Sequence, residues 1–210
     1  MDRERELLDA WRGGDLAAGS DLFEGHYRAI YRFFRARVEG ELDDLVQTTF
    51  ARCAASKDKL DGDGTFRGYA YAVARNVLRE CYKAQRRRGA REVDFGCDSV
   101  ADMGVSPTGQ LAKRREQRLL LEALRTIPLD HQIALELFYW EDLSSADLAR
   151  VLDIPHGTAK TRVRAARKAL EARLAELASS PELLASTLGD LERWSADLRG
   201  HLADDPRAGR

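Results

Sequence analysis

Residues 156–170, HGTAKTRVRAARKAL, set lysines and arginines at regular intervals among alanines and threonines. In an α-helix, Ala159, Val163, Ala166 and Leu170 would lie within about 60° of one another and form an apolar stripe. The other side of that helix would present small groups that approach a DNA groove closely and cations that reach phosphates and base edges. This pattern predicts a DNA-binding helix with six candidate contact residues: Thr158, Lys160, Thr161, Arg162, Arg164 and Lys168.

A shorter helix before this one would position it on DNA. Ser144 is an expected N-cap for the sequence SADLARVLD, and the turn IPHG leads from there into the basic stretch. Gly157 would allow a close approach of the two helices at the start of the second. Apolar residues of the first helix would meet the apolar stripe of the second: Leu148, Ala149 and Leu152. Two helices joined by a short turn, the second of them basic, form a helix-turn-helix, here about residues 144–163.

A second basic cluster, residues 75–91, holds seven lysines and arginines and a single acidic residue, Glu80. Thr65 is an expected N-cap for the helix that contains most of this cluster. The expected apolar stripe of this helix is Phe66, Tyr69 or Ala70, Val73, Val77 and Cys81. The opposite side would carry a row of cations four residues apart: Arg75, Arg79 and Lys83. Two basic clusters in a chain of net charge −1 indicate two separate polyanion contacts.

The composition is typical of a helical protein. Of the 210 residues, 44% are hydrophobic and 33% are charged, and Ala, Leu, Arg and Glu dominate. Because no run approaches the roughly 18 apolar residues of a membrane span and the N-terminus is too charged for a signal peptide, we expect a cytoplasmic protein without membrane insertion. The three cysteines and four histidines show no disulfide or metal-site spacing. We therefore expect neither enzymatic activity nor a cofactor.

Helical periodicity divides the chain into two parts. It is present from about residue 21 to 88, is lost over the glycine-rich residues 89–110, and returns from residue 111. We predict an all-α protein of two small helical domains, residues 1–88 and 111–178, joined by a flexible linker at 89–110. Residues 179–210 would add an acidic amphipathic helix, with Ser180 as its cap and Pro181 in its first position.

Most of the chain resembles a known family. The sequence IPLDHQIALELFYWEDLSSADLARVLDIPHGTAKTRVRAARKAL resembles the promoter-reading C-terminal domain of the extracytoplasmic-function (ECF) group of bacterial sigma factors. DDLVQTTFARCAAS and FRGYAYAVARNVLRECYKAQRRR are similar to the N-terminal domain of the same group. The resemblance implies a dissociable subunit that binds core RNA polymerase and promoter DNA, recognises the minus-ten and minus-thirty-five elements and starts transcription. An anti-sigma factor or another regulator is a further candidate partner.

The resemblance assigns roles to particular residues. The helix-turn-helix would read the minus-thirty-five element in the major groove. Unpaired bases of the minus-ten element would meet aromatic rings and cations, because bases stack on rings without help from pairing. The expected contacts with this melted strand are Asp63, Tyr69, Tyr71, Arg75, Asn76, Arg79 and Lys83. Since Tyr69 and Tyr71 cannot share a helix face, we expect one of them in the core. The residues implied in polymerase binding are Asp44, Leu45, Gln47, Thr48 and Phe50.

Two other functions remain open at this point. The chain could be a stand-alone helix-turn-helix regulator, in which the N-terminal half would serve for dimerisation or ligand binding. It could also be a helical adaptor whose basic helices bind acidic proteins. For residues 179–210 there are three alternatives: an extra helix packed on the C-terminal domain, an acidic helix that covers a basic surface until a partner displaces it, or a docking tail.

Overall fold

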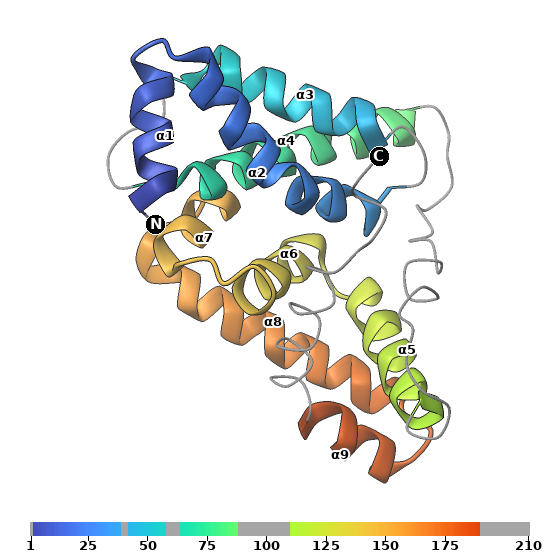
Figure 1. Cartoon of the computed structure of the whole chain (residues 1–210). Coiled ribbons are helices and arrows are strands. Elements are labelled where there is room, and N and C mark those ends of the chain that lie inside the picture. The colour runs from blue at the N-terminus through green and yellow to red at the C-terminus, as the bar shows by residue number, and fades with distance from the viewer. Residues whose placement is uncertain (1, 39–41, 58–63, 88–109, 190–210) are drawn as a thin grey trace. The chain divides into compact units, whose positions relative to one another are not determined.

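The computed structural model describes residues 2–38, 42–57, 64–87 and 110–189 (Figure 1). Within these ranges the chain forms helices and no strand, so the all-α prediction is confirmed. The helices are α1 (Asp2–Arg12), α2 (Leu16–Arg35), α3 (Leu42–Ala55), α4 (Phe66–Arg87), α5 (Gln110–Thr126), α6 (Leu129–Tyr139), α7 (Ser145–Leu152), α8 (His156–Leu177) and α9 (Pro181–Gly189). The chain divides into two compact units, residues 1–97 with 149–153 and residues 98–148 with 154–210. The predicted linker, residues 89–110, lies almost wholly outside the described residues.

In the first unit, α1 is a helix that the sequence analysis did not predict. It packs on α2 and α4 and buries Leu8 and Trp11. The Trp11 ring meets Phe23 and Phe66 edge-on, with ring centroids 5.3 and 5.9 Å apart. Gly19 of α2 makes this possible, because a Cβ atom there would lie 2.4 Å from the Trp11 ring. The contact of α1 with α2 therefore depends on Gly19, whose lack of a side chain makes room for the Trp11 ring.

Helix α2 begins before Asp21, where the sequence pattern first became clear. Gly14 has a φ of 103°, a left-handed conformation that ends α1 and turns the chain. Asp15 then caps α2, and its carboxylate accepts hydrogen bonds from the backbone N–H groups of Ala17 and Ala18 at 2.9 and 3.2 Å. Such a cap satisfies N–H groups that have no partner within the helix. The helix start is thus set by a glycine turn followed by an aspartate cap.

In the second unit, α8 packs against α6 and α5. Helix α6 starts directly after Pro128, which is its N-cap and offers no side-chain hydrogen bond. Asp130 lies inside the first turn of α6, where its negative charge suits the helix dipole. The Gln132 side chain donates from Nε2 to the carbonyl oxygen of Ile127 at 2.9 Å, which ties α6 to the end of α5.

Helix α9 belongs to the second unit and packs on α5 and on α8 (Figure 1). The predicted cap is confirmed, because Ser180 Oγ accepts a hydrogen bond from the Leu183 N–H at 3.2 Å. Thr187 is fully buried, and Ser186 donates a hydrogen bond to Glu116 of α5. For residues 181–189, these contacts favour the first of the three alternatives, an extra helix packed on the C-terminal domain. The rest of the acidic extension, residues 190–210, lies outside the described residues.

Candidate nucleic-acid interface

Helix α8 has the two faces that its sequence predicted. The apolar stripe Ala159, Val163, Ala166 and Leu170 is buried, and Leu174 extends it. Four of the six predicted DNA contacts are exposed: Lys160, Thr161, Arg164 and Lys168. The other two, Thr158 and Arg162, are half-buried at the edges of the stripe. Because Ala165 is also exposed, the outer face alternates cations with small side chains, a surface that can lie close to a groove.

Local hydrogen bonds and backbone conformation define the turn between α7 and α8. Ser144 caps α7 as predicted: its Oγ accepts the N–H of Asp147 at 3.0 Å and donates to the carboxylate of Asp147 at 2.9 Å. Asp153, with a φ of 55°, reverses the chain after α7, and Pro155 is the N-cap of α8. The role predicted for Gly157 was wrong, since a Cβ atom there would meet nothing within 4 Å. No close approach of helices requires this glycine.

Two other arginines of α8 are bound to neighbours in the second unit. Arg167 donates from Nε to Glu171 at 2.9 Å, one turn further along the helix. Hydrogen bonding to Glu171 and the nearby Tyr139 raise the pKa of Arg167. Arg173 donates to Thr126 Oγ1 at 2.9 Å and so ties α8 to the end of α5. These two arginines therefore hold the helix in its unit.

Burial and charge also affect His131, which lies on α6 at the edge of the α8 stripe. Burial lowers the pKa of this histidine, and the positive charge of Arg162 lowers it further, while Asp130 opposes the shift. His131 is therefore biased towards its neutral form beside α8. A neutral imidazole leaves Arg162 as the cation at this edge of the helix.

In the first unit, Thr65 caps α4 as predicted, and its Oγ1 accepts the Gly68 N–H at 3.0 Å. One of the two tyrosines lies in the core, as expected. Tyr71 is only 1% exposed and packs edge-on against Phe33, with ring centroids 5.6 Å apart. Tyr69 is half-buried, and its hydroxyl is held by the carbonyl oxygen and the Oγ of Ser56 at 3.1 and 2.7 Å. Of these two tyrosines, only Tyr69 keeps exposed surface that a DNA base could contact.

The predicted row of cations on α4 was wrong at its first position. Arg75 is only 3% exposed, because it follows the core residue Tyr71 by one turn and shares its side of the helix. Asn76, Arg79 and Lys83 are exposed, and their spacing of three and four residues puts them on one face. The remaining predicted contact, Asp63, lies outside the described residues. The apolar stripe of α4 is also displaced from the prediction, since Ala74 and Leu78 are buried whereas Val73 and Cys81 are half-buried.

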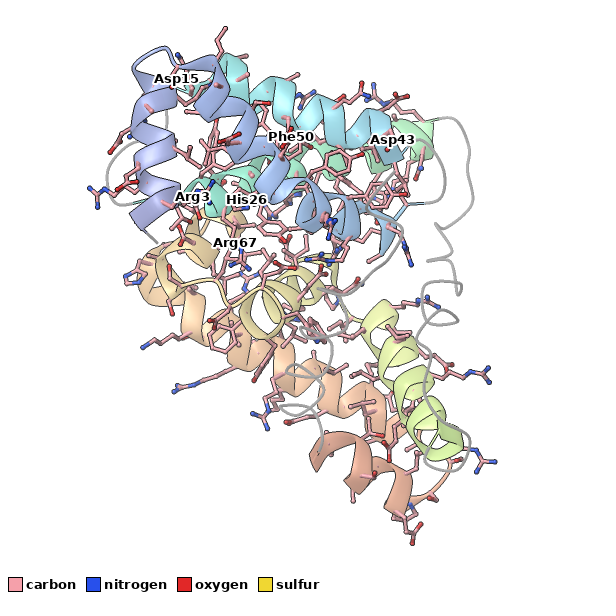
Figure 2. All side chains as sticks on the ribbon, in the orientation of Figure 1. Arg3, Asp15, His26, Asp43, Phe50 and Arg67 are labelled. Carbon is pink, nitrogen blue, oxygen red and sulfur yellow. The ribbon has the colours of Figure 1, made fainter. Side chains whose placement is uncertain are left out.

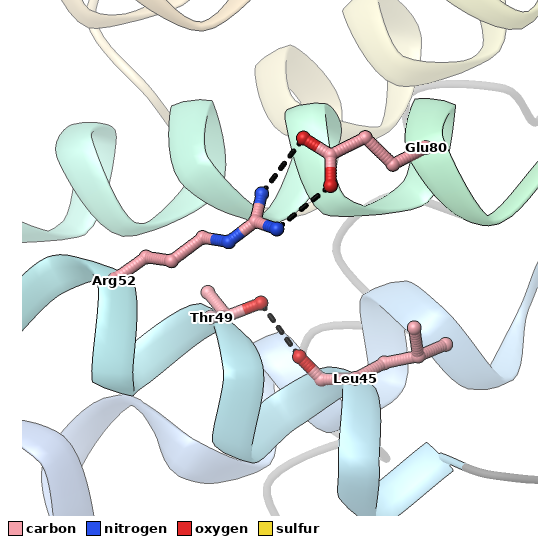
Figure 3. A network of polar contacts seen from close by, with 4 residues as sticks. All are labelled: Leu45, Thr49, Arg52 and Glu80. Carbon is pink, nitrogen blue, oxygen red and sulfur yellow. Dashed lines mark hydrogen bonds and ion pairs between the residues drawn. The ribbon is translucent and has the colours of Figure 1, made fainter.

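A bidentate ion pair joins α3 to α4 beside this face (Figure 3). The guanidinium of Arg52 donates to the two carboxylate oxygens of Glu80 at 2.8 and 2.7 Å. This hydrogen bonding lowers the pKa of Glu80 and raises the pKa of Arg52. Both side chains keep about half of their surface exposed, 44% for Arg52 and 57% for Glu80. A pair in such a setting contributes only about 0–1 kcal/mol to stability.

Helix α3 carries the residues implied in polymerase binding. Asp44 and Gln47 are exposed, and Leu45 and Thr48 are half-buried beside them. Phe50 is in the core instead (Figure 2). Its ring lies tilted against Phe23 and stacks on Tyr27 of α2, with ring centroids 5.0 and 6.4 Å apart. The prediction that Phe50 forms part of the polymerase-contact surface was therefore wrong. It follows Val46 by one turn, and the apolar periodicity of α3 turns both inward.

Sequence reasoning missed two features that adjoin these surfaces. Tyr27 is 41% exposed and donates a hydrogen bond to Asp43 at 3.1 Å. Arg52 was not singled out at all. The isolated acid Glu80 within a basic cluster was the one available signal, because a lone carboxylate among cations invites a search for its partner. That partner comes from another helix, which periodicity cannot reveal.

Two classes of site are not found among the residues that the structure describes. No helix in these ranges is long and apolar enough to cross a membrane. Within the same ranges, no group of three or more His, Cys, Asp or Glu side chains could hold a metal ion.

Two family models match the chain, one in each half of its sequence. The model for sigma-70 region 2 matches residues 22–88, and the model for sigma-70 region 4 matches residues 117–170. The first match begins within α2 and contains α3 and α4, and the second contains the predicted helix-turn-helix, residues 144–163. The order of the two matches along the chain is the order that the sequence resemblance predicted.

Curated relatives carry the name ECF RNA polymerase sigma-E factor. The protein from Haemophilus influenzae is 26% identical over 182 residues, which are 83% of this chain and 96% of that protein. The protein from Escherichia coli is 25% identical over 139 residues, 63% of this chain and 73% of that protein.

Solved structures share the fold. CnrH, in complex with the cytosolic domain of CnrY, has a TM-score of 0.60 and 22% identity, over 84% of this chain and 99% of that chain. The sigma factor RpoE from Bartonella quintana, in complex with the anti-sigma factor NepR, has a TM-score of 0.55 and 21% identity, over 77% of this chain and 97% of that chain.

Proposed function

This chain belongs to the ECF group of bacterial RNA polymerase sigma factors, which bind core polymerase and direct it to promoters, and we propose that three surfaces divide this work. The first is the outer face of α8, the second is the exposed face of α4, and the third is the exposed face of α3. The chain itself would perform no chemistry, and phosphodiester bond formation would belong to the polymerase. Its place of action would be the cytoplasm, where promoter DNA and polymerase meet.

The outer face of α8 would read the upstream promoter element. Thr161, Arg164 and Lys168 are exposed on the side opposite the buried stripe and Lys160 is exposed at its flank, which supports this proposal. Side chains of Arg and Lys pair with guanine edges in the major groove and with phosphates. Arg164 and Lys168, one turn apart, would be the base-directed pair, and Lys160 would contact phosphate.

The exposed face of α4 would hold the separated strand of the downstream element. Asn76, Arg79 and Lys83 supply one amide and two cations on a single face, and Tyr69 adds a ring whose hydroxyl is fixed by Ser56. A cationic surface beside an anchored aromatic ring suits a single strand, whose phosphates and unstacked bases need both. Tyr71 and Arg75 do not belong to this proposed surface because they are buried.

The exposed face of α3 would dock on core polymerase. Asp44 and Gln47 are its outermost polar residues, and Leu45 and Thr48 flank them. Phe50 would act only indirectly, by supporting α3 from the core through its contacts with α2. An Asp44→Ala/Gln47→Ala variant should fold normally and lose affinity for core polymerase.

The observation that carries the proposed function is the joint match to sigma-70 regions 2 and 4 on two units that each present a basic helix face. The direct test is run-off transcription by core polymerase with and without this protein. We expect a discrete promoter-dependent transcript only when the protein is added. A tight complex with promoter DNA in the absence of polymerase, together with no such transcript, would contradict the proposal.

We also propose a protein regulator as a further partner. The support is that both solved relatives were seen in complex with a second protein, in one case an anti-sigma factor. Such a regulator would compete with polymerase for α3 or with DNA for α8. The purified regulator should then reduce run-off transcription. If the regulator binds elsewhere than α3, an excess of the Asp44→Ala/Gln47→Ala variant should bind the regulator and relieve this inhibition.

A further inference from the structure

Glu80 stands alone as an acid within the proposed strand-binding surface. It is the single carboxylate of residues 75–91, which carry seven cations, and it is exposed on α4. Its neighbours on that helix include Asn76, one turn before it, and Lys83, three residues after it. Side chains three or four residues apart on a helix surface lie about 5–6 Å from one another at Cβ. A free Glu80 would therefore be within reach of Lys83.

A free carboxylate here would work against strand binding in two ways. It would pair with Lys83 along the helix and so withdraw one ammonium group from the phosphates. It would also repel a strand that lies within a Debye length, about 8–10 Å at physiological salt. Consistent with this proximity, the charge of Lys83 contributes to the lowered pKa of Glu80, although the hydrogen bonds from Arg52 are the larger cause.

Arg52 prevents both effects because it binds Glu80 from the neighbouring helix. Its two hydrogen bonds, 2.8 and 2.7 Å, occupy both carboxylate oxygens and turn the carboxylate towards α3 (Figure 3). Since both side chains are half exposed, the pair adds little to stability. Its effect on the electrostatic potential of the α4 face is the larger consequence, because the binding of a polyanion depends on the number of available cations.

We propose that Arg52 is a positioning residue for promoter opening: it holds the Glu80 carboxylate towards α3 and thereby leaves Lys83 available to the unpaired strand. Arg52 touches neither base nor phosphate in this role. The inference rests on the proposed function, since it requires that the face of Asn76, Arg79 and Lys83 binds the separated strand.

The test uses the full chain in complex with core polymerase. The DNA is a promoter fragment that this holoenzyme selects from genomic DNA, prepared fully paired and with the downstream element held open by mismatches. Binding of both forms is measured over a series of salt concentrations for wild type, Arg52→Gln, Glu80→Gln and the double variant. Thermal unfolding of the same four proteins is measured in parallel.

We expect Arg52→Gln to weaken binding of the mismatched form about fivefold and to lower the salt slope by about 0.7, the value for one lost phosphate contact on a single strand. Binding of the paired form should change less than twofold. Glu80→Gln should bind the mismatched form at least as tightly as wild type. The double variant should return to within about twofold of wild type, because removing the carboxylate removes the need for its partner.

A purely structural ion pair would behave differently. Arg52→Gln, Glu80→Gln and the double variant would then lose equal amounts of binding and of melting temperature, and this result would overturn the inference. A double variant that binds the mismatched form no better than Arg52→Gln would do the same, as would an unchanged Arg52→Gln. Arg12→Gln is the matched control, because it removes another partly exposed arginine of the same unit, paired with Asp9 at 3.7 Å, and should leave both DNA forms unaffected.

A separate variant distinguishes failure of the inference from failure of the proposed function. Arg79→Ala should weaken binding of the mismatched form whatever Arg52 does. If Arg79→Ala weakens it and Arg52→Gln does not, the inference alone is wrong. If Arg79→Ala leaves it unchanged, the strand-binding surface is misassigned and the role of Arg52 is excluded with it.

Discussion

Helices α4 and α8 are both basic and both 22 residues long, yet they are buried very differently. Helix α8 buries five residues, all apolar and three or four positions apart: Ala159, Val163, Ala166, Leu170 and Leu174. Helix α4 buries eight residues, which cover a wider arc and include a cation: Phe66, Gly68, Ala70, Tyr71, Ala74, Arg75, Val77 and Leu78. Within its unit, α4 is contacted by α1, α2 and α3.

The width of the buried arc decides how much of each helix is available to DNA. The narrow stripe of α8 leaves its opposite face to a run of cations and small residues, as expected for a helix inserted into a groove. The wide arc of α4 leaves a strip of a few polar residues, Asn76, Arg79 and Lys83, next to a neighbouring helix that supplies Arg52. One helix can therefore act by itself, whereas the other acts as part of a surface made by two.

The largest effect should come from the core side of α4. Tyr71→Ala removes a ring that is 1% exposed, so we expect the free energy of unfolding to fall by about 3–5 kcal/mol. Asn76→Ala, on the exposed strip of the same helix, should leave stability nearly unchanged and impair promoter opening. Chemical unfolding and permanganate reactivity of the promoter measure the two quantities. If Tyr71→Ala were stable but defective in opening, the division of α4 into core and strip would be wrong.

On the outer face of α8, substitutions should change DNA binding more than stability. Arg164→Ala and Lys168→Ala should each weaken duplex binding at the upstream element by about 1–3 kcal/mol, with unfolding free energies within about 0.5 kcal/mol of wild type. Lys160→Ala should reduce the salt slope of duplex binding by about one unit, as for a lost phosphate contact. Fluorescence anisotropy of holoenzyme and labelled promoter DNA measures both. Arg173→Ala is the control on the same helix, because Arg173 is bound to Thr126 and should not affect DNA.

Two glycines test the same contrast between a packed and an open helix surface. A methyl group added at Gly157 of α8 would meet nothing within 4 Å, so Gly157→Ala should stabilise the protein by about 0.5–1 kcal/mol. Gly19 of α2 lies against Trp11, so Gly19→Ala should destabilise it by about 1–3 kcal/mol. Thermal unfolding gives both signs. Two substitutions with the same sign would show that the surroundings of these glycines do not decide their effect.

A small loss of stability should follow from removing α9, the helix after α8. Truncation after Ala178 removes α9, which packs on α5 and α8, so we expect a loss of about 1 kcal/mol, or roughly 4–8 °C in melting temperature for a unit of this size. Run-off transcription should not increase. A truncated protein that is equally stable and transcribes more would instead support the alternative in which the acidic extension covers a basic surface.

The contrast between α4 and α8 also explains where sequence reasoning succeeded. Side-chain caps were predicted correctly at Thr65, Ser144 and Ser180, because a cap is a local hydrogen bond between residues three positions apart. The stripe of α8 was correct because one narrow apolar face follows the helical period. Both depend on neighbours in the sequence.

The errors share a different cause. Arg75 and Phe50 were each given the wrong exposure, because helices distant in the sequence decide which side of α3 and α4 is covered. Packing between helices distant in the sequence leaves no period in the sequence. Helix α1 was missed as well; it buries Leu8 and Trp11, and the glycine that receives Trp11 lies in the next helix.

The sequence by itself therefore determined the helical class, the two basic helices, the buried stripe of α8 and the residues of that helix that can face a groove. These follow from periodicity, capping and charge, which act over one or two turns of chain. Only the tertiary structure decided that α4 presents Asn76, Arg79 and Lys83 rather than Arg75, and that Glu80 is bound by Arg52. The reason is that burial on two sides and an ion pair between helices depend on which segments meet in space.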